Sequence, residues 1–306
     1  RLSNMLRKLF LTLTLAALSV LFLTGCGPLP SSGRGGLNVL ATTTVLADIT
    51  RNVAGDRVPV ESLLPVGMDP HAYQLAPADV VKITDSAVLI QNGINYERFL
   101  GTALENAGGK HLLITATNGL TPRSAADAGQ GSGDPHMWLD PNLVITYVKN
   151  IRDGLIQADP EGKATYTTNA DAYIAQLRDL DAWIVAQVNS IPAERRLLVT
   201  NHEALGYFAD RYGFTIVGTV IPSLSTGAST SARGLAEVID LIKTSGAPAI
   251  FLGDVENPDL ANQIAAETGV SVVADLHLES LTDGAPAATY IEMMKYNVAR
   301  IVEALR

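Results

Sequence analysis

The stretch that decides the fold is KATYTTNADAYIAQLRDLDAWIVAQVNSI, which runs from Lys163 to Ile191 and contains neither glycine nor proline. Apolar residues recur in it at steps of three and four, as on the buried face of a helix: Tyr166, Ala170, Tyr173, Ile174, Leu177, Leu180, Ile184, Val188 and Ile191. The spacing predicts one amphipathic helix of about 29 residues, roughly 43 Å long at a rise of about 1.5 Å per residue. Such a helix is long enough to traverse two domains.

On both sides of this helix, short apolar runs alternate with helical patterns. Before it we expect strands at 37–45, 58–64, 88–91 and 112–115, and helices at 46–53, 77–84, 96–106 and 141–157. After it we expect strands at 197–200, 214–220, 249–252 and 270–274, and helices at 205–212, 232–244, 258–268 and 289–305. Short continuous apolar strands that alternate with helices imply a parallel sheet covered on both faces. The sequence therefore predicts an α/β protein with two lobes, each with a mostly parallel sheet flanked by helices, joined by one long linking helix.

The first residues have the order of a secretory signal, with a basic start, an apolar run and small residues before a possible cleavage site. The apolar run, 9–23, is shorter than the roughly 20 residues of a membrane span. The sequence Leu23-Thr24-Gly25-Cys26 resembles the bacterial lipobox, in which Cys26 becomes the lipidated first residue of the mature protein. The alternative is an ordinary signal peptide followed by a buried structural cysteine. The expected divisions are a signal peptide at 1–25, lipidated Cys26 with a flexible spacer to 36, an N-terminal lobe at 37–160, the linking helix at 161–192 and a C-terminal lobe at 193–306.

Composition narrows the classes of function. With 306 residues the chain is long enough for two buried cores, and 47% hydrophobic residues without a charge block are typical of a soluble globular protein. The net charge of −9 argues against a nucleic-acid partner and is compatible with a cation ligand. The single cysteine excludes an internal disulfide.

Three histidines stand in loops where a stiff backbone can present an imidazole. His136 lies in Asp134-Pro135-His136-Met137-Trp138-Leu139-Asp140-Pro141, His71 in Met68-Asp69-Pro70-His71-Ala72-Tyr73, and His202 in Thr200-Asn201-His202-Glu203. Proline fixes its own φ and biases the preceding residue toward extended geometry. Each histidine follows an expected strand, and ligands of parallel sheets bind at the carboxyl ends of the strands. We therefore expect the three imidazoles to converge on one ion, although their wide spacing matches no short zinc motif.

A fourth ligand is expected from the junction after the last strand, Ala274-Asp275-Leu276-His277-Leu278-Glu279-Ser280-Leu281. If this stretch is extended, Asp275, His277 and Glu279 point to one side because side chains alternate. Position alone does not choose among them. Three imidazole nitrogens with one carboxylate oxygen suit Zn²⁺, and Mn²⁺ or Fe²⁺ are less favoured as the number of histidines rises. His111, at the start of a strand, is interpreted as a surface or capping residue instead.

The motifs resemble those of the zinc- and manganese-binding solute-binding lipoproteins of bacterial metal ABC transporters, the metal-binding cluster A-I family. The resemblance runs from about residue 37 to the C-terminus and is carried by Met68–Tyr73 with 75–79, Asp134–Pro141, His202 with 204–209 and 211–213, and Tyr290–Asn297. It implies two α/β lobes joined by a long helix, with a metal between them. Carried over by position, it implies that His71 and His136 are first-lobe ligands and that His202 and Glu279 are second-lobe ligands.

The chain departs from the family pattern in ways that affect the choice of metal. The fourth ligand of relatives is commonly Asp, whereas Glu279 could bind through one oxygen or two. The third position is His or Glu in relatives, and His202 favours zinc. Zinc-specific members often carry a His-rich acidic loop between the first two ligands, but 121–133 contains no histidine.

The resemblance implies an extracytoplasmic receptor, not an enzyme, that is lipid-anchored to the bacterial cell membrane and works as a monomer. It would capture a divalent transition metal, with zinc favoured over manganese or iron, and deliver it to an ABC permease. Affinity should fall below about pH 6.5, because metal binding requires neutral imidazoles. A zinc hydrolase would need a metal-bound water and a base such as Glu203, and the chain has no His-Glu-x-x-His helix. A surface adhesin is a further alternative, since that role is also ascribed to members of this family.

Overall fold

The structure is a computed structural model that describes residues 37–306 except 102–103, 105–110, 125–132 and 227. The expected signal peptide, Cys26 and the spacer lie outside the described residues. Within the described part of the chain, none of the helices combines the length and the apolar character that crossing a membrane requires.

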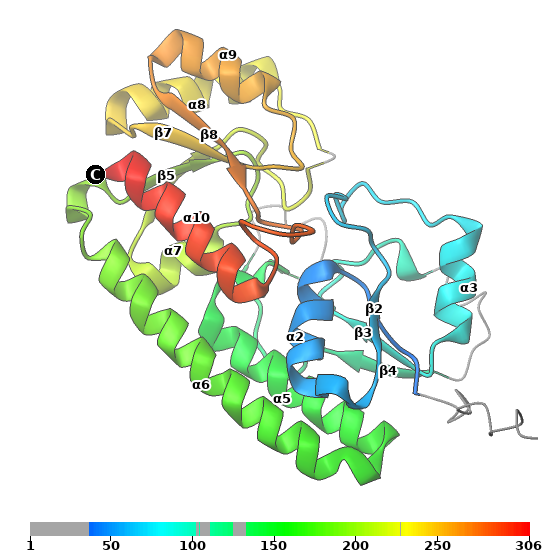
Figure 1. Ribbon diagram of the computed structural model, residues 1–306. Coiled ribbons are helices and arrows are strands. Elements are labelled where there is room, and N and C mark those ends of the chain that lie inside the picture. The colour runs from blue at the N-terminus through cyan, green and yellow to red at the C-terminus, as the bar shows by residue number, and fades with distance from the viewer. Residues whose placement is uncertain (1–36, 102–103, 105–110, 125–132, 227) are drawn as a thin grey trace, which may run out of the picture. The chain divides into compact units, whose positions relative to one another are not determined.

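The first sheet contains four parallel strands in the order β2-β1-β3-β4. These are β1 (Val39–Ala41), β2 (Val60–Ser62), β3 (Val88–Gln91) and β4 (Leu112–Thr115). Alternate residues face opposite sides: Val39 and Ala41 pack toward α2 (Thr44–Ala54) and α5 (Pro141–Ala158), whereas Leu40 packs with Ile83 of α3 (Pro77–Asp85). Both faces are therefore covered, as the continuous apolar strands predict (Figure 1).

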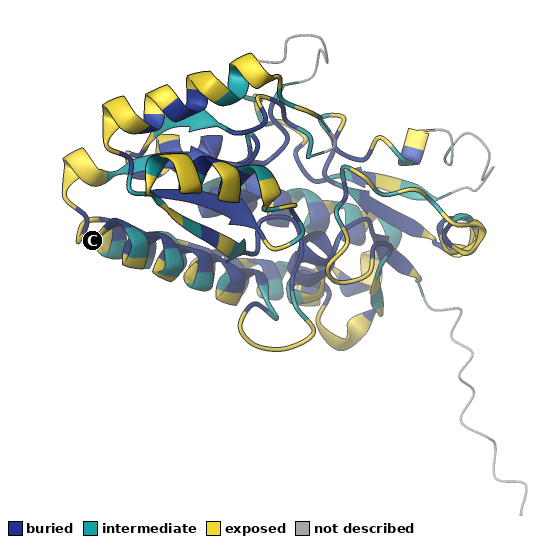
Figure 2. Cartoon of the chain, turned by 90° about the horizontal axis from the view of Figure 1, so that it is seen from above, coloured by how far each residue is buried: buried dark blue, intermediate teal, exposed yellow. Residues whose placement is uncertain are grey.

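The second sheet repeats this arrangement, with parallel strands in the order β6-β5-β7-β8. The strands are β5 (Leu197–Thr200), β6 (Thr215–Thr219), β7 (Ala249–Gly253) and β8 (Ser271–Leu276). One face packs with α7 (Gly206–Tyr212) and α10 (Tyr290–Leu305), and the other with α8 (Ala232–Ser245) and α9 (Asp259–Thr268). Helices α8 and α9 bury one side against the sheet, and surface helices of the molecule show exposed outward faces and buried inward faces (Figure 2).

Helix α6 (Lys163–Val188) has 26 residues and links the two lobes. It packs against α2 and α5 of the first lobe and against α10 and α7 of the second (Figure 1). The apolar stripe predicted from Tyr166 to Ile191 is buried, although the helix itself ends at Val188, three residues earlier than predicted, and one hydrophobic cluster runs through both lobes along it. The α/β fold with two lobes and a linking helix is confirmed. Residues 37–306 form one compact unit, so the domain limits at 160 and 192 remain a prediction.

Two local differences from the expected elements have physical causes. Strand β1 ends at Ala41 because the Thr43 side chain accepts the backbone N–H of Leu46 and begins α2 there. The helix expected at 96–106 is wrong in its first turn, since residues 96–99 form a loop; later positions lie partly outside the described residues. The cause is Glu97, whose carboxylate accepts the backbone N–H groups of Asn92 and Gly93 and curls the chain back.

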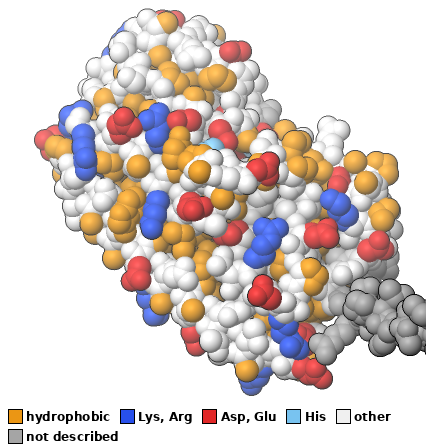
Figure 3. Space-filling view, viewed as in Figure 1, with side chains coloured by type: hydrophobic (Ala, Val, Ile, Leu, Met, Phe, Trp, Pro, Cys, Tyr) orange, Lys and Arg blue, Asp and Glu red, His pale blue; other side chains and the backbone are white. Residues whose placement is uncertain are grey.

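Charged side chains of both signs are interspersed on the face shown in Figure 3. Lys and Arg side chains alternate there with Asp and Glu rather than gathering in one area. That face therefore presents no continuous basic surface of the kind that a nucleic acid requires.

Candidate metal centre

Four side chains from four loops meet at one point of the structure. His71, His136, His202 and Glu279 each offer one donor atom, and these atoms all lie within 4.8 Å of one another. Their loops follow β2, β4, β5 and β8, so all four approach from the carboxyl ends of strands. The structure thus brings together every residue of the ligand set that the resemblance implied.

The distances suit a small four-coordinate cation. Glu279 Oε1 lies 3.6 Å from Nε2 of His71, 3.5 Å from Nε2 of His136 and 3.5 Å from Nε2 of His202. The Nε2 atoms of His71 and His136 are 3.3 Å apart. A tetrahedral ion with ligand bonds of about 2.0–2.1 Å needs donor atoms about 3.3–3.4 Å apart. These four separations are therefore close to those that zinc would impose, and the two between His202 and the other imidazoles lie within 4.8 Å.

Two of these donor atoms are buried without a hydrogen-bond partner, His202 Nε2 and Glu279 Oε1. Buried polar atoms in folded proteins are nearly always paired, and an unpaired one is costly. Both atoms face the point where the four side chains meet. A cation bound there would satisfy both, so the donor set fits a metal ion.

Carboxylates outside the cluster orient two of the imidazoles. His136 Nδ1 lies 2.8 Å from Asp134 Oδ1, which also accepts the backbone N–H of His136. His202 Nδ1 is hydrogen-bonded to Glu256 Oε1, and Glu256 Oε2 accepts the backbone N–H of Gly253. With a proton on Nδ1, each imidazole keeps the lone pair of Nε2 for a metal.

Electrostatics draw cations to the cluster. Burial alone would raise the pKa of Glu279, but the three imidazoles, whose Nε2 atoms lie 3.5–3.6 Å from Oε1, hold this pKa well below its usual range. Burial lowers the pKa of His202, but the hydrogen bond to Glu256 and the nearby carboxylate of Glu279 outweigh burial and raise the pKa to about 10. The pKa of His136 is also raised, because Asp134 and Glu279 outweigh burial. The carboxylates thus favour positive charge at this point, whether carried by protons or by a metal.

The two other candidates for the fourth position point elsewhere. Strand β8 ends at Leu276, so the extended geometry that would align them does not continue. Asp275 accepts hydrogen bonds from Tyr296 and Arg300 of α10. His277 Nδ1 lies 2.7 Å from Asp254 Oδ2. Neither residue belongs to the cluster of four donors, and His111 also lies outside that cluster.

The sequence did not reveal three neighbours of the cluster. Glu256 orients His202 and follows β7, so its place at the carboxyl end of a strand was an available signal. Tyr96 donates a hydrogen bond of 2.5 Å to Glu279 Oε2, and the sequence gives no sign of this contact because the apolar pattern predicts a helix at 96–106. Trp138 is buried and donates from Nε1 to the backbone oxygen of Leu278. The contacts of Tyr96 and Trp138 join residues from opposite lobes, whereas Glu256 and His202 both belong to the second lobe.

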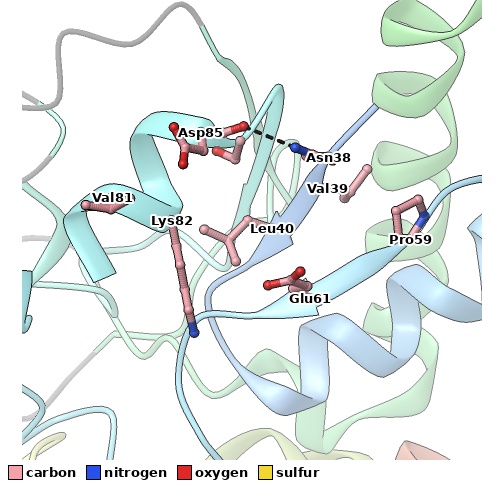
Figure 4. Close-up of a pocket in the computed structure, with 9 residues that line it drawn as sticks. Asn38, Val39, Leu40, Pro59, Glu61, Val81, Lys82 and Asp85 are labelled. Carbon is pink, nitrogen blue, oxygen red and sulfur yellow. Dashed lines mark hydrogen bonds between the residues drawn. The ribbon is translucent and has the colours of Figure 1, made fainter. Parts of the chain in front are cut away.

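A separate groove of about 280 Å³ lies between β2 and α3 (Figure 4). Its lining includes Asn38, Glu61 and Lys82, and the side chain of Asn38 donates to the backbone oxygen of Asp85. Asn38 and Asp85 precede β1 and β3, so the groove lies at the amino ends of the strands. The histidine cluster lies at the carboxyl ends of the strands, so the groove and the cluster are at opposite ends of the strands.

Two α/β lobes bridged by a helix, with a cation site between them, define the class of two-lobed solute-binding proteins. The family model described as zinc-uptake complex component A, periplasmic, matches residues 39–304. The chain belongs to this family, the metal-binding substrate-binding lipoproteins of ABC transporters.

Individual relatives bind different metals. The manganese-binding lipoprotein MntA of Halalkalibacterium halodurans is 33% identical over 290 residues, which cover 93% of this chain and 95% of the relative. The iron-binding protein YfeA of Yersinia pestis is 32% identical over 276 residues, 90% of this chain and 88% of that protein. The structure of the periplasmic zinc binding protein TroA from Treponema pallidum matches with a TM-score of 0.79 and 29% identity, covering 88% of this chain and 99% of that one. The metal of this chain therefore has to be argued from its own residues.

Proposed function

We propose that this protein is an extracytoplasmic receptor that binds Zn²⁺ on His71, His136, His202 and Glu279 and delivers it to an ABC permease. The observation that supports the metal is the donor set, in which three imidazole nitrogens lie 3.5–3.6 Å from one carboxylate oxygen and all four atoms lie within 4.8 Å of one another. Manganese and iron sites generally use more oxygen donors, so the nitrogen-rich set favours zinc. Manganese or iron remains the alternative cargo within the same family.

The same donor set argues against the hydrolase alternative. Catalytic zinc sites keep one position open for water, whereas four protein donors close the tetrahedron. Family members are substrate-binding components of transporters, which agrees with a protein that is not an enzyme. The proposed role is therefore capture and release of the ion.

The lipid anchor is part of this proposal. Relatives are named lipoproteins, and the Leu-Thr-Gly-Cys sequence ending at Cys26 supports removal of residues 1–25 followed by lipidation. Anchored and monomeric, the receptor would hold its cargo near the permease. Expression of Cys26→Ala in a bacterial host should move the protein from the membrane fraction to the soluble fraction; retention in the membrane fraction would refute the anchor.

Elemental analysis of the fragment 37–306, which forms its own compact unit, tests the metal site. Purified without chelator, it should contain one zinc per chain. His136→Ala should lose this zinc, whereas His111→Ala should retain it because His111 is outside the cluster. Manganese or iron in the wild type would overturn the zinc assignment but keep the receptor. No metal after reconstitution with each ion would refute the site.

A further inference from the structure

The two oxygens of the Glu279 carboxylate have different surroundings. Oε1 faces the three Nε2 atoms at 3.5–3.6 Å and has no hydrogen-bond partner. Oε2 accepts a hydrogen bond of 2.5 Å from the hydroxyl of Tyr96. Both side chains are buried, so water does not compete for this bond. The pair joins the first lobe to the second at the site itself.

The loop that carries Tyr96 is held in a conformation that ordinary residues avoid. Ile94 and Asn95 have φ values of 55° and 57°, in the left-handed region that a β-branched residue such as isoleucine rarely adopts. The carboxylate of Glu97 holds the loop by accepting the backbone N–H groups of Asn92 and Gly93 and the hydroxyl of Thr42. Strain of this kind persists where the surroundings enforce it, and it is common at functional sites.

Aromatic packing leaves the Tyr96 ring little freedom. Its centroid lies 5.2 Å from that of His71, with the rings nearly perpendicular at 87°, and 4.9 Å from that of Trp138. Trp138 in turn donates to the backbone oxygen of Leu278, the residue before Glu279. The Tyr96 ring and the Glu279 carboxylate are therefore fixed relative to each other. The Tyr96 hydroxyl cannot leave Oε2 without disturbing the packing of the ring in the first lobe or the position of Glu279 in the second.

We propose that Tyr96 determines metal preference by occupying Oε2, which leaves Glu279 a single oxygen for the metal. This inference rests on the proposed function. Without the phenol, the long Glu279 side chain could turn both oxygens to the ion and add a fifth donor. A single oxygen with three nitrogens suits four-coordinate zinc, whereas added carboxylate oxygen and higher coordination suit manganese. Tyr96 is thus a positioning residue, which acts on the metal through Glu279.

The variant Tyr96→Phe tests this, because it removes the hydroxyl and keeps the ring that packs on His71 and Trp138. Competition titrations should give a ratio of manganese to zinc dissociation constants that falls by about 10–100-fold, the usual effect of an outer partner on a metal ligand. The visible spectrum of the Co²⁺ form should change from a four-coordinate to a five-coordinate type. Tyr166→Phe is the matched control: Tyr166 of α6 also donates to a carboxylate, that of Asp159, at 2.7 Å, and neither residue belongs to the cluster, so its ratio should equal that of the wild type.

Each contrary outcome refutes a distinct statement. One bound metal in both proteins with an unchanged ratio and spectrum would overturn the role of Tyr96 and leave the proposed function intact. Equal weakening of zinc and manganese would assign Tyr96 a purely structural role. Absence of metal from the wild type would refute the proposed function itself. If Tyr96→Phe does not fold, X-ray absorption of the zinc-loaded wild type decides, since a two-oxygen Glu279 contradicts the inference and a four-ligand shell supports it.

Discussion

Replacing Glu256 by glutamine should weaken zinc binding although Glu256 is not a donor to the ion. The side chain is buried; its Oε1 is hydrogen-bonded to His202 Nδ1, and its Oε2 accepts the backbone N–H of Gly253. An amide of the same shape has only one acceptor oxygen. If that oxygen stays on Gly253, the amide NH₂ faces His202 Nδ1 and forces the ring proton onto Nε2. That proton occupies the atom meant for the metal.

The magnitude follows from this tautomer change. Loss of an outer partner to a metal-binding histidine typically costs about 10–100-fold in affinity, which corresponds to about 1.4–2.7 kcal/mol. We expect a shift of this size in the zinc dissociation constant of Glu256→Gln, measured by competition with a chromophoric chelator. Glu237→Gln on α8, where Glu237 pairs with exposed Arg233, should bind zinc like the wild type. An unchanged dissociation constant in a folded Glu256→Gln protein would refute the tautomer argument.

Three further predictions concern pH and packing. The pKa of metal-free His202 is about 10, so below that pH zinc must displace a proton from His202. The affinity for zinc should therefore rise by about tenfold per pH unit for each proton released. A zinc affinity that stays constant between about pH 5 and 8 would contradict this. Leu177→Ala in α6, where Leu177 is completely buried, should cost about 2–5 kcal/mol of unfolding free energy in urea, whereas exposed Val185→Ala on the same helix should change it by less than about 0.5 kcal/mol. The hydrogen bond from Arg57 lowers the pKa of Asp159 to about 2. This pair therefore stabilises the fold above the ordinary carboxyl pKa of about 3.9, and the contribution is lost as pH falls toward about 2. Arg57→Ala should make the unfolding free energy fall less steeply with decreasing pH in this range, and the same slope as the wild type would count against the pair.

The pH dependence of zinc affinity should extend to higher pH than the sequence alone indicates. Ordinary imidazoles lose their protons near pH 6.5, so the sequence places the loss of affinity below that value. In the folded protein burial lowers the pKa of His202, but the carboxylates of Glu256 and Glu279 outweigh burial and raise this pKa to about 10, so the dependence should continue well above neutrality. The difference arises because neighbouring carboxylates are known only once the chain is folded.

The sequence by itself determined the features that depend on local pattern. The stripe from Tyr166 to Val188 specifies a helix because 3.6 residues per turn place its members on one face, and the structure buries all of them. Continuous apolar strands specify covered parallel sheets, and strand ends followed by histidine mark the edge where ligands gather. These signals act over a few residues, so they can be read before the chain folds.

Only the tertiary structure decided which groups surround the ion. Asp275, His277 and Glu279 stand at equal steps in the sequence, but the end of β8 at Leu276 and partners on other elements turn the first two away. Tyr96 and Glu256 reach the site from 183 and 54 residues along the chain from their partners. Contacts over such separations depend on how sheets and lobes pack, and no local pattern records them. The donor residues could therefore be anticipated, whereas the groups that orient them could not.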